Sequence, residues 1–314
     1  MQALSDLKED IVGNRTPDLW VVGQMKFYQE RHQHALVLQL FLDHFMCVGA
    51  SKRQIADYIR SAPSQTFNPL LTRVGQPARP LQGRWPTSHV LTIVWSSVTA
   101  FAANKRELAF LYAKFLSYWY DDDGTSPTPA ASSQPWSNFR FRHPPATAPD
   151  SVMFHIFLTG FKKFNDLEAV LQVLHDMTIR GVRPDTHNWT VVAGMFAKDD
   201  PTRAEKILFE MEKGLEEGKA LDEHQHEPTR SRTGPAQRSS SWVPIPTIVT
   251  YTAILRGLIE SHRLGDARKF VEKIEAIGVK PGMDARLDHV VEILWQRQRR
   301  ATAQYVATSP VPVR

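Results

Sequence analysis

The sequence contains an internal repeat of 35 residues, and a repeat of this length constrains the fold more than any single motif. Segments 151–185 and 248–282 align without a gap. Both carry an aromatic residue at the fourth position, Phe154 and Tyr251, and both have Gly, Val, a basic residue and Pro just before their last residue. A third copy, 186–219, lies between them with one residue deleted. The chain is therefore predicted to be built from repeated units.

Each copy of the repeat predicts two amphipathic helices. In the first copy, apolar residues recur near helical spacing between positions 152 and 161, and again between positions 167 and 177. Asn165, followed by Glu168, resembles a capping box at the start of the second helix, and Asp200 before a proline suits the equivalent point of the next copy. Gly181 and Gly278 are expected to end the second helices.

A single helical hairpin of this size cannot cover its apolar stripe, so neighbouring copies must stack and share a core. We therefore predict an all-α fold, an α-solenoid of antiparallel helix hairpins whose concave face suits an extended ligand. Segments 18–52 and 91–125 look like degenerate copies. A final helix over 284–300 is expected to cap the stack through its apolar stripe of Leu287, Val290, Val291 and Leu294.

Composition divides the chain into repeat and non-repeat segments. Residues 124–149 are rich in Pro, Ser, Thr and Ala, and residues 220–246 are polar, which predicts flexible insertions. The predicted order is a degenerate helical region at 1–123, a linker at 124–149, two repeats at 150–219, an insertion at 220–246, a repeat with its capping helix at 247–300, and a tail at 301–314.

The repeat length and the Gly-x-x-Pro-Asp ending at 181–185 resemble the pentatricopeptide-repeat family. The resemblance covers 149–219 and 246–295, and an ungapped length of 35 favours this family over the related 34-residue tetratricopeptide repeats. It implies a short member of the fungal, mitochondrial type. Such a protein would bind single-stranded RNA and act on organellar transcripts in their processing, stability or translation, with no cofactor, metal or catalytic site.

The resemblance also implies which side chains meet the RNA. In the family, one base is met by the second, fifth and last residues of a unit. Transferred position by position, the predicted base-contacting residues are Val152, His155, Asp185, His187, Thr190, Val249 and Thr252. His155 is not one of the usual Asn, Ser or Thr selectors, and Gly282 has no side chain at a terminal position. The base sequence of a target therefore cannot be derived.

Basic residues farther along the same helices are candidates for contacts with phosphate groups. They are Lys162, Lys163, Lys198 and Arg256. The alternative for each is an ordinary solvated surface charge. The aromatic residues Phe154, Trp189 and Tyr251 are expected to pack in the core rather than to stack on bases.

Net charge, cysteine content and hydropathy limit the kinds of partner, metal site and location that can be expected. A net charge of +5 and a pI near 9.3 fit a polyanionic partner without requiring one. Cys47 is the only cysteine, which rules out an intrachain disulfide and a cysteine zinc cluster. No segment is apolar and long enough to predict a membrane span. The first ten residues lack the Arg-rich, acid-poor character of a transit peptide, so a mitochondrial location is an expectation from the resemblance alone.

Two alternative functions remain open. An enzyme is disfavoured, because the histidine pairs His32/His34 and His224/His226 and the acidic run 121–123 do not complete a ligand set at informative spacing. A protein-binding scaffold is the stronger alternative, since helical solenoids also bind peptides. Three clear copies would contact about three bases. A partner such as the mitochondrial ribosome or another RNA-bound protein is therefore expected.

Overall fold

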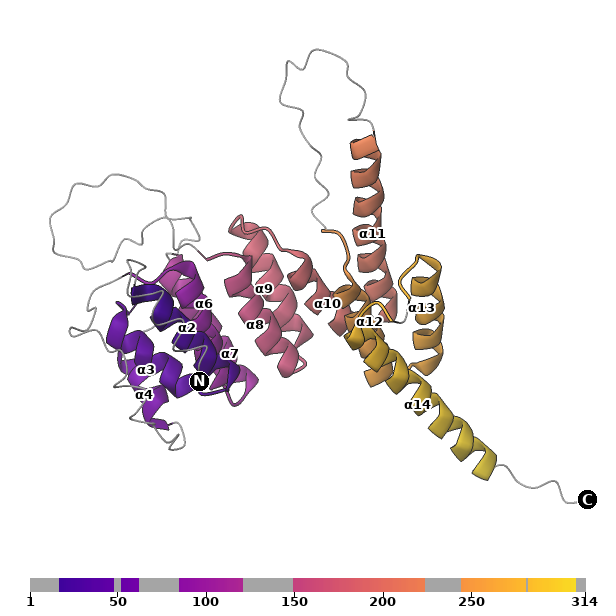
Figure 1. The fold of residues 1–314 in the computed structure, drawn as a ribbon, viewed down its shortest axis with the longest axis horizontal. Coiled ribbons are helices and arrows are strands. Elements are labelled where there is room, and N and C mark those ends of the chain that lie inside the picture. The colour runs from indigo at the N-terminus through magenta and orange to yellow at the C-terminus, as the bar shows by residue number, and fades with distance from the viewer. Residues whose placement is uncertain are drawn as a thin grey trace, which may run out of the picture. The chain divides into compact units, whose positions relative to one another are not determined.

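The computed structural model describes residues 17–47, 52–61, 85–120, 149–223, 244–280 and 282–308. Within these ranges the chain folds into α-helices and contains no β-strand (Figure 1). The predicted all-α class is confirmed for this part of the chain, and the solenoid arrangement stays a prediction. Most of the predicted linker and residues 224–243 of the predicted insertion lie outside the described residues.

The helices form two compact units, which divide between Phe164 and Asn165. The first unit contains α2 (Pro17–Glu30), α3 (His34–His44), α4 (Lys52–Ser61), α6 (Ser88–Ala100), α7 (Lys105–Trp119) and α8 (Ser151–Lys163). The second unit contains α9 (Leu167–Ile179), α10 (Thr186–Asp199), α11 (Pro201–Glu223), α12 (Ile248–Glu260), α13 (Leu264–Ala276) and α14 (Ala285–Thr308). The division falls inside the first predicted repeat, between its two helices.

The starts of two helices in the second unit test the predicted caps. Asp200 accepts a hydrogen bond from the Arg203 amide at 3.3 Å, which confirms it as the cap before α11. The predicted capping box at Asn165 is wrong, because Asp166 is the cap of α9 and accepts from the Ala169 amide at 3.2 Å. Asn165 instead adopts a left-handed φ of 55° in the preceding turn, a conformation that asparagine tolerates better than most residues.

Two helices end at the predicted glycines, and two others extend beyond their predicted ends. Gly181 and Gly278 adopt φ values of 71° and 92° directly after α9 and α13, as expected for glycines that terminate helices. By contrast, α11 continues through Glu223, into the predicted insertion, and α14 continues through Thr308, into the predicted tail. Neither extension contains a proline or a glycine that would end the helix.

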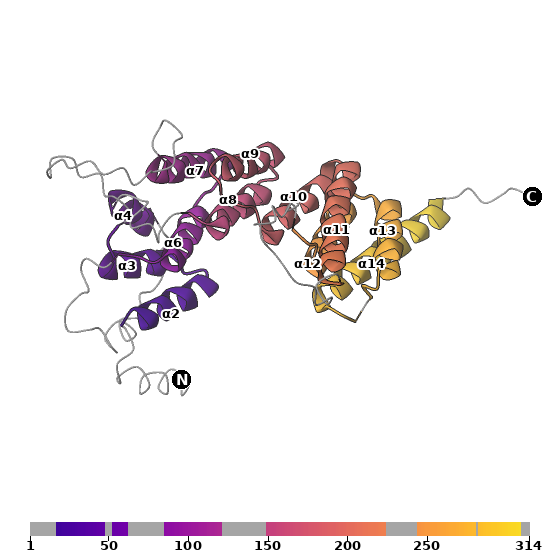
Figure 2. The ribbon, with the colours of Figure 1, turned by 90° about the horizontal axis from the view of Figure 1, so that it is seen from above.

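The core of the first unit is an aromatic cluster contributed by α6, α7 and α8. The ring of Phe157 lies 4.9 Å from that of Phe115, 5.0 Å from that of Tyr112 and 5.6 Å from that of Trp95, measured between centroids. Helix α6 packs on α8, and α3 lies beside α2 and α4 (Figure 2). The segments predicted to be degenerate copies thus contain the helix pairs α2/α3 and α6/α7.

Two histidines make the stability of the first unit depend on pH. Burial lowers the pKa of His34 and of His44, and the positive charge of His32 lowers that of His34 further, while Asp43 partly offsets the effect at His44. Below about pH 6.5 the unfolded chain therefore binds more protons than the folded chain, and the free energy of unfolding falls as the pH drops toward the lowered values.

We expect the urea midpoint of this unit to be lower at about pH 5.5 than at about pH 7.5. The double variant His34→Gln/His44→Gln should lose less over the same interval, because glutamine does not titrate. Denaturation followed by circular dichroism at both pH values measures the difference. An equal loss in the two proteins would assign the effect to other groups.

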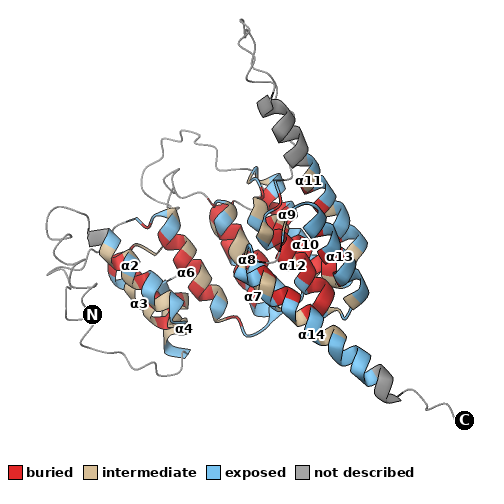
Figure 3. Cartoon of the chain, turned by 45° about the vertical axis from the view of Figure 1, so that its right-hand side comes forward, coloured by how far each residue is buried: buried red, intermediate tan, exposed pale blue. Residues whose placement is uncertain are grey.

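The core of the second unit is centred on α12, which packs against α10, α13 and α14. Figure 3 shows the buried positions concentrated on α10 and α12. Leu287, Val290, Val291 and Leu294 of α14 are all buried. The predicted apolar stripe is thus confirmed as the face by which this helix covers α12 and α13.

The predicted packing of the repeat aromatics is confirmed at two positions of three. Phe154 and Tyr251 are buried. Trp189 is half-buried, and its indole N–H is enclosed without a hydrogen-bond partner within the described residues. The Tyr251 hydroxyl donates to the Glu212 carboxylate at 3.3 Å, and burial together with this carboxylate raises the pKa of Tyr251. These side chains hold helices together.

A helix that crosses a lipid bilayer must be long and predominantly apolar. No helix within the described ranges is both long enough and apolar enough to cross one.

Candidate nucleic-acid interface

Helices α10 and α12 approach each other so closely that their backbones touch. A Cβ atom added to Gly257 would lie 2.5 Å from the carbonyl oxygen of Gly194 and 2.9 Å from the Cβ of Ala197. No side chain fits at this crossing, so glycine is required at Gly257. Gly194 and Gly257 were not among the residues predicted to matter from the sequence. The signal was available, since both occupy the middle of the first helix of their copies, where glycine weakens a helix unless a close contact uses it.

Threonine hydroxyl groups link the N-terminal parts of the same two helices. The Thr190 hydroxyl lies 2.8 Å from that of Thr250 and 2.7 Å from the Thr186 carbonyl oxygen. The Thr250 hydroxyl oxygen in turn accepts from the Thr247 amide at 3.2 Å. Both threonines are buried, so this bond forms where solvent cannot compete for it. It fixes the register in which α10 and α12 pack.

The two predicted threonine readers lie in the same unit but are largely enclosed. Thr190 is 8% exposed and Thr252 is 7% exposed. Thr252 donates its hydroxyl hydrogen to the Ile248 carbonyl oxygen at 2.8 Å, within its own helix. A base could therefore meet only a small part of either side chain, and contact through Thr190 and Thr252 stays a prediction.

The second positions of these two copies are more accessible. His187 and Val249 are exposed, and each stands in the first turn of its helix. Asp185 is half-buried and caps α10 by accepting from the Asn188 amide at 3.0 Å. Its carboxylate thus has a structural task, whether or not it also contacts a ligand.

The backbones of Lys198 and Arg256, the two predicted phosphate-contacting residues of this unit, are neighbours at the crossing. The amide nitrogen of Lys198 is 3.2 Å from the place that a Cβ on Gly257 would occupy, so its backbone lies next to that of Arg256. Arg256 is exposed and Lys198 is half-buried. Two cations on neighbouring helices can pair with successive phosphates of one strand.

The remaining predicted residues belong to α8 in the first unit. Val152 is 49% exposed, and His155 is half-buried with its Nε2 atom 3.2 Å from the Thr159 hydroxyl. Lys162 and Lys163 are exposed in the last turn, where positive charge also favours the helix dipole. The structure therefore groups these four residues on one helix, and groups the others on α10 and α12 of the second unit.

The histidine pairs were the candidate metal ligands. The rings of His32 and His34 lie 6.0 Å apart, and the Nδ1 atom of His34 is 3.4 Å from the Ser97 hydroxyl. No group of three or more His, Cys, Asp or Glu side chains converges as a metal site within the described ranges. His224, His226 and the acidic run 121–123 fall outside them.

No protein-family model matches the sequence, and no curated protein is significantly similar to it. The repeat register and the contact between α10 and α12 are thus the two observations on which a function can be argued.

Proposed function

We propose that this chain is a non-catalytic helical-repeat protein of the pentatricopeptide-repeat type, an α-solenoid that binds single-stranded RNA. The observation that carries the proposal is the backbone contact between α10 and α12, the first helices of successive copies. It brings matched repeat positions of two copies into one neighbourhood, as a ligand read one unit at a time requires. By the same resemblance, the proposed setting is the mitochondrion and its transcripts, with a ribosome or another RNA-bound protein as partner.

The chemistry of this surface fits RNA in two respects. His187 and Val249 are exposed at second positions, where a side chain can pack on the face of a base. The backbones of Lys198 and Arg256 are neighbours at the crossing, and we expect their side chains to pair with phosphates. Such binding needs no metal and no cofactor. It should also fall steeply as the salt concentration rises, because each phosphate contact releases counterions.

The double variant Lys198→Glu/Arg256→Glu is expected to lose at least about tenfold in affinity for single-stranded RNA at about 50 mM salt. The slope of log affinity against log salt should also become shallower by about 1.4, that is, about 0.7 for each lost contact. Fluorescence anisotropy of a labelled oligonucleotide across a salt series measures both quantities.

A matched control keeps the change in net charge the same. Lys206 and Lys269 are exposed on α11 and α13, the second helices of their hairpins. The variant Lys206→Glu/Lys269→Glu should bind nearly as tightly as the wild type. Equal losses in both double variants would mean that only total charge matters, and the proposed interface would then be wrong.

The second candidate function is a protein-binding scaffold. Two observations favour it: the hydroxyls of Thr190 and Thr252 are engaged within the protein, and Val249 presents an apolar side chain to solvent. A peptide with apolar side chains would use such a surface without phosphate contacts. If the folded wild-type protein shows no salt-sensitive binding to RNA, the scaffold function is favoured over RNA binding.

A further inference from the structure

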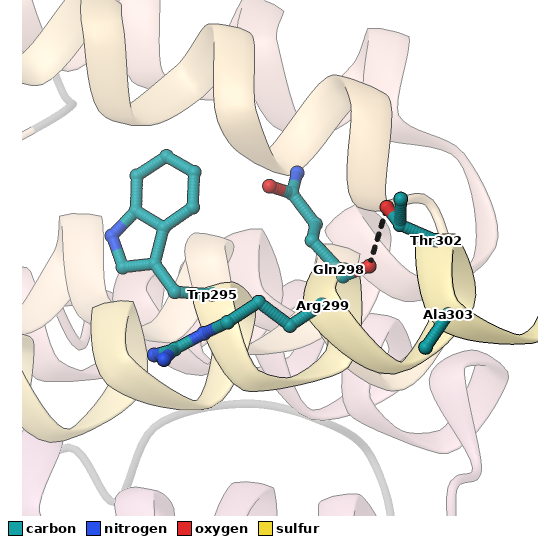
Figure 4. A pocket seen from close by; sticks show the side chains of 5 residues that line it. All are labelled: Trp295, Gln298, Arg299, Thr302 and Ala303. Atoms are coloured by element: carbon teal, nitrogen blue, oxygen red, sulfur yellow. Dashed lines mark hydrogen bonds between the residues drawn. The ribbon is translucent and has the colours of Figure 1, made fainter.

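The C-terminal part of helix α14 extends past the helices on which it packs (Figure 1), and the helix carries a partly exposed tryptophan, Trp295. Leu294 is buried against the unit, whereas Trp295 is 37% exposed and residues 299–304 are exposed. A shallow hollow of about 870 Å³ opens at this point of the helix, lined by Trp295, Gln298, Arg299, Thr302 and Ala303 (Figure 4).

Helix α14 is fastened beside the hollow by contacts with the end of α12 and the start of α13. Arg297 donates to the Ile259 carbonyl oxygen at 2.7 Å, and the side chain of Gln298 donates to the Leu264 carbonyl oxygen at 3.3 Å. Because these two bonds anchor consecutive residues of α14, the face that carries Trp295 has a fixed orientation. The surface therefore exists before any ligand arrives.

Trp295 is flanked by a guanidinium group on its own helical face. Arg299 stands one turn beyond it, and its Nη2 atom lies 3.3 Å from the Glu292 carboxylate one turn before it. The same carboxylate accepts from the side chain of Gln296 at 3.0 Å. Glu292 thus holds the Arg299 side chain back along the helix toward its N-terminal end, and Trp295 and Arg299 both line the hollow (Figure 4).

Beyond Glu292, whose carboxylate pairs with Arg299, the helix carries basic side chains and no acidic one. Residues 293–308 include Arg297, Arg299 and Arg300 and no acidic residue. An aromatic platform beside arginines is the combination with which proteins hold single-stranded nucleic acid, because bases stack on the ring and phosphates pair with the cations. A second copy of this chain fits poorly, since a two-fold contact here would oppose the same arginines to each other.

We propose that this hollow binds single-stranded nucleic acid, with one base stacked on Trp295 and the adjoining phosphates paired with Arg299 and Arg300. The site lies outside the repeat positions discussed above. Only the choice of RNA as the cellular ligand of this site rests on the proposed function. The binding of single-stranded nucleic acid itself is inferred from the chemistry of this surface. Stacking and phosphate pairing do not read the 2′-hydroxyl group, so RNA and DNA strands should bind alike here.

The test compares variants of the full chain for binding to labelled oligo(U) and oligo(dT) of about 12 nucleotides. Trp295→Ala should weaken binding to both by about tenfold, and Trp295→Phe should stay within about threefold of the wild type, because its ring still stacks. Binding should quench more tryptophan emission in the wild type than in Trp295→Phe. Circular dichroism spectra confirm that each variant is folded.

A control uses another exposed aromatic residue of the same unit that has no arginine beside it on its helix face. Phe209 on α11 is 61% exposed and stands between Glu205 and Lys213 on its helix face. Phe209→Ala should leave binding unchanged. The inference is overturned if Trp295→Ala binds like the wild type, if Phe209→Ala loses as much, or if sedimentation shows that Trp295→Ala only dissociates a dimer.

The outcomes also separate this site from the repeat surface. Binding lost only in Lys198→Glu/Arg256→Glu refutes the α14 site and keeps the proposed function. Binding weakened only in Trp295→Ala keeps the α14 site and refutes the α10/α12 interface. A wild-type chain that binds neither oligonucleotide refutes both.

Discussion

Replacing Phe157 with alanine is expected to lower the free energy of unfolding of the first unit by about 3–5 kcal/mol. The side chain is fully buried on α8 and meets the rings of Phe115, Tyr112 and Trp95 from α6 and α7. Its removal costs the transfer energy of the ring and leaves a cavity bounded by three large rings that cannot easily collapse into it. A loss of this size is a large part of the stability of a typical domain.

Urea denaturation followed by aromatic fluorescence measures the loss, with Phe110→Ala as the matched control. Phe110 is on α7 in the same unit but is 56% exposed, so its removal should change the free energy of unfolding by about 0.5 kcal/mol or less. If the two variants lose similar amounts, the cluster around Phe157 is not the core of this unit.

Replacing Gly257 with valine should destabilise the second unit by about 3 kcal/mol. The first atom added would lie 2.5 Å from a backbone oxygen of α10, and backbone cannot swing aside as the end of a flexible side chain can. Helices α10 and α12 must therefore separate along the crossing. Their separation also strains the hydrogen bond between Thr190 and Thr250, and the small gain in helix propensity over glycine does not offset these costs.

The control is Gly265→Val on α13, where no neighbouring atom lies within 4 Å of an added Cβ. This variant should differ from the wild type by about 0.5 kcal/mol or less. Thermal unfolding of both proteins, monitored by circular dichroism, gives the comparison. If the Gly257→Val and Gly265→Val proteins have the same midpoint of thermal unfolding, helices α10 and α12 tolerate a side chain between them.

The periodicity of the sequence predicted the helices of the repeats well because each boundary carries its own local signal. The left-handed glycines at Gly181 and Gly278 and the cap at Asp200 act within one turn, so the sequence around them is sufficient. The cap of α9 was misplaced by one residue. Asn165 and Asp166 are both good caps, and the turn that precedes the helix decides between them.

The lengths of α11 and α14 could not be predicted from the repeat. The alignment fixes where a copy ends, but a helix continues as long as its residues favour it and no breaker follows. The division of the chain between Phe164 and Asn165 has no local signal either. It follows from which helices share a core, and the sequence gives no direct measure of that.

The candidate site shows the same limit. Repeat positions identified Thr190 and Thr252 but not their burial, because burial depends on how closely the neighbouring helix approaches. That approach depends on Gly194 and Gly257, which look unremarkable in isolation. Trp295 and Arg299 were overlooked for another reason: both lie within the predicted capping helix but outside its apolar stripe, which ends at Leu294, and their exposure is visible only in the structure.

The glycine contact between α10 and α12 has a consequence for ligand spacing. Where side chains separate two helices, each substitution at the interface changes the interaxial distance. Here main-chain atoms set that distance, so it should stay constant while the surrounding residues vary. The distance between His187 and Val249 would then stay constant. New ligand preferences could evolve by substitution of these two exposed residues alone.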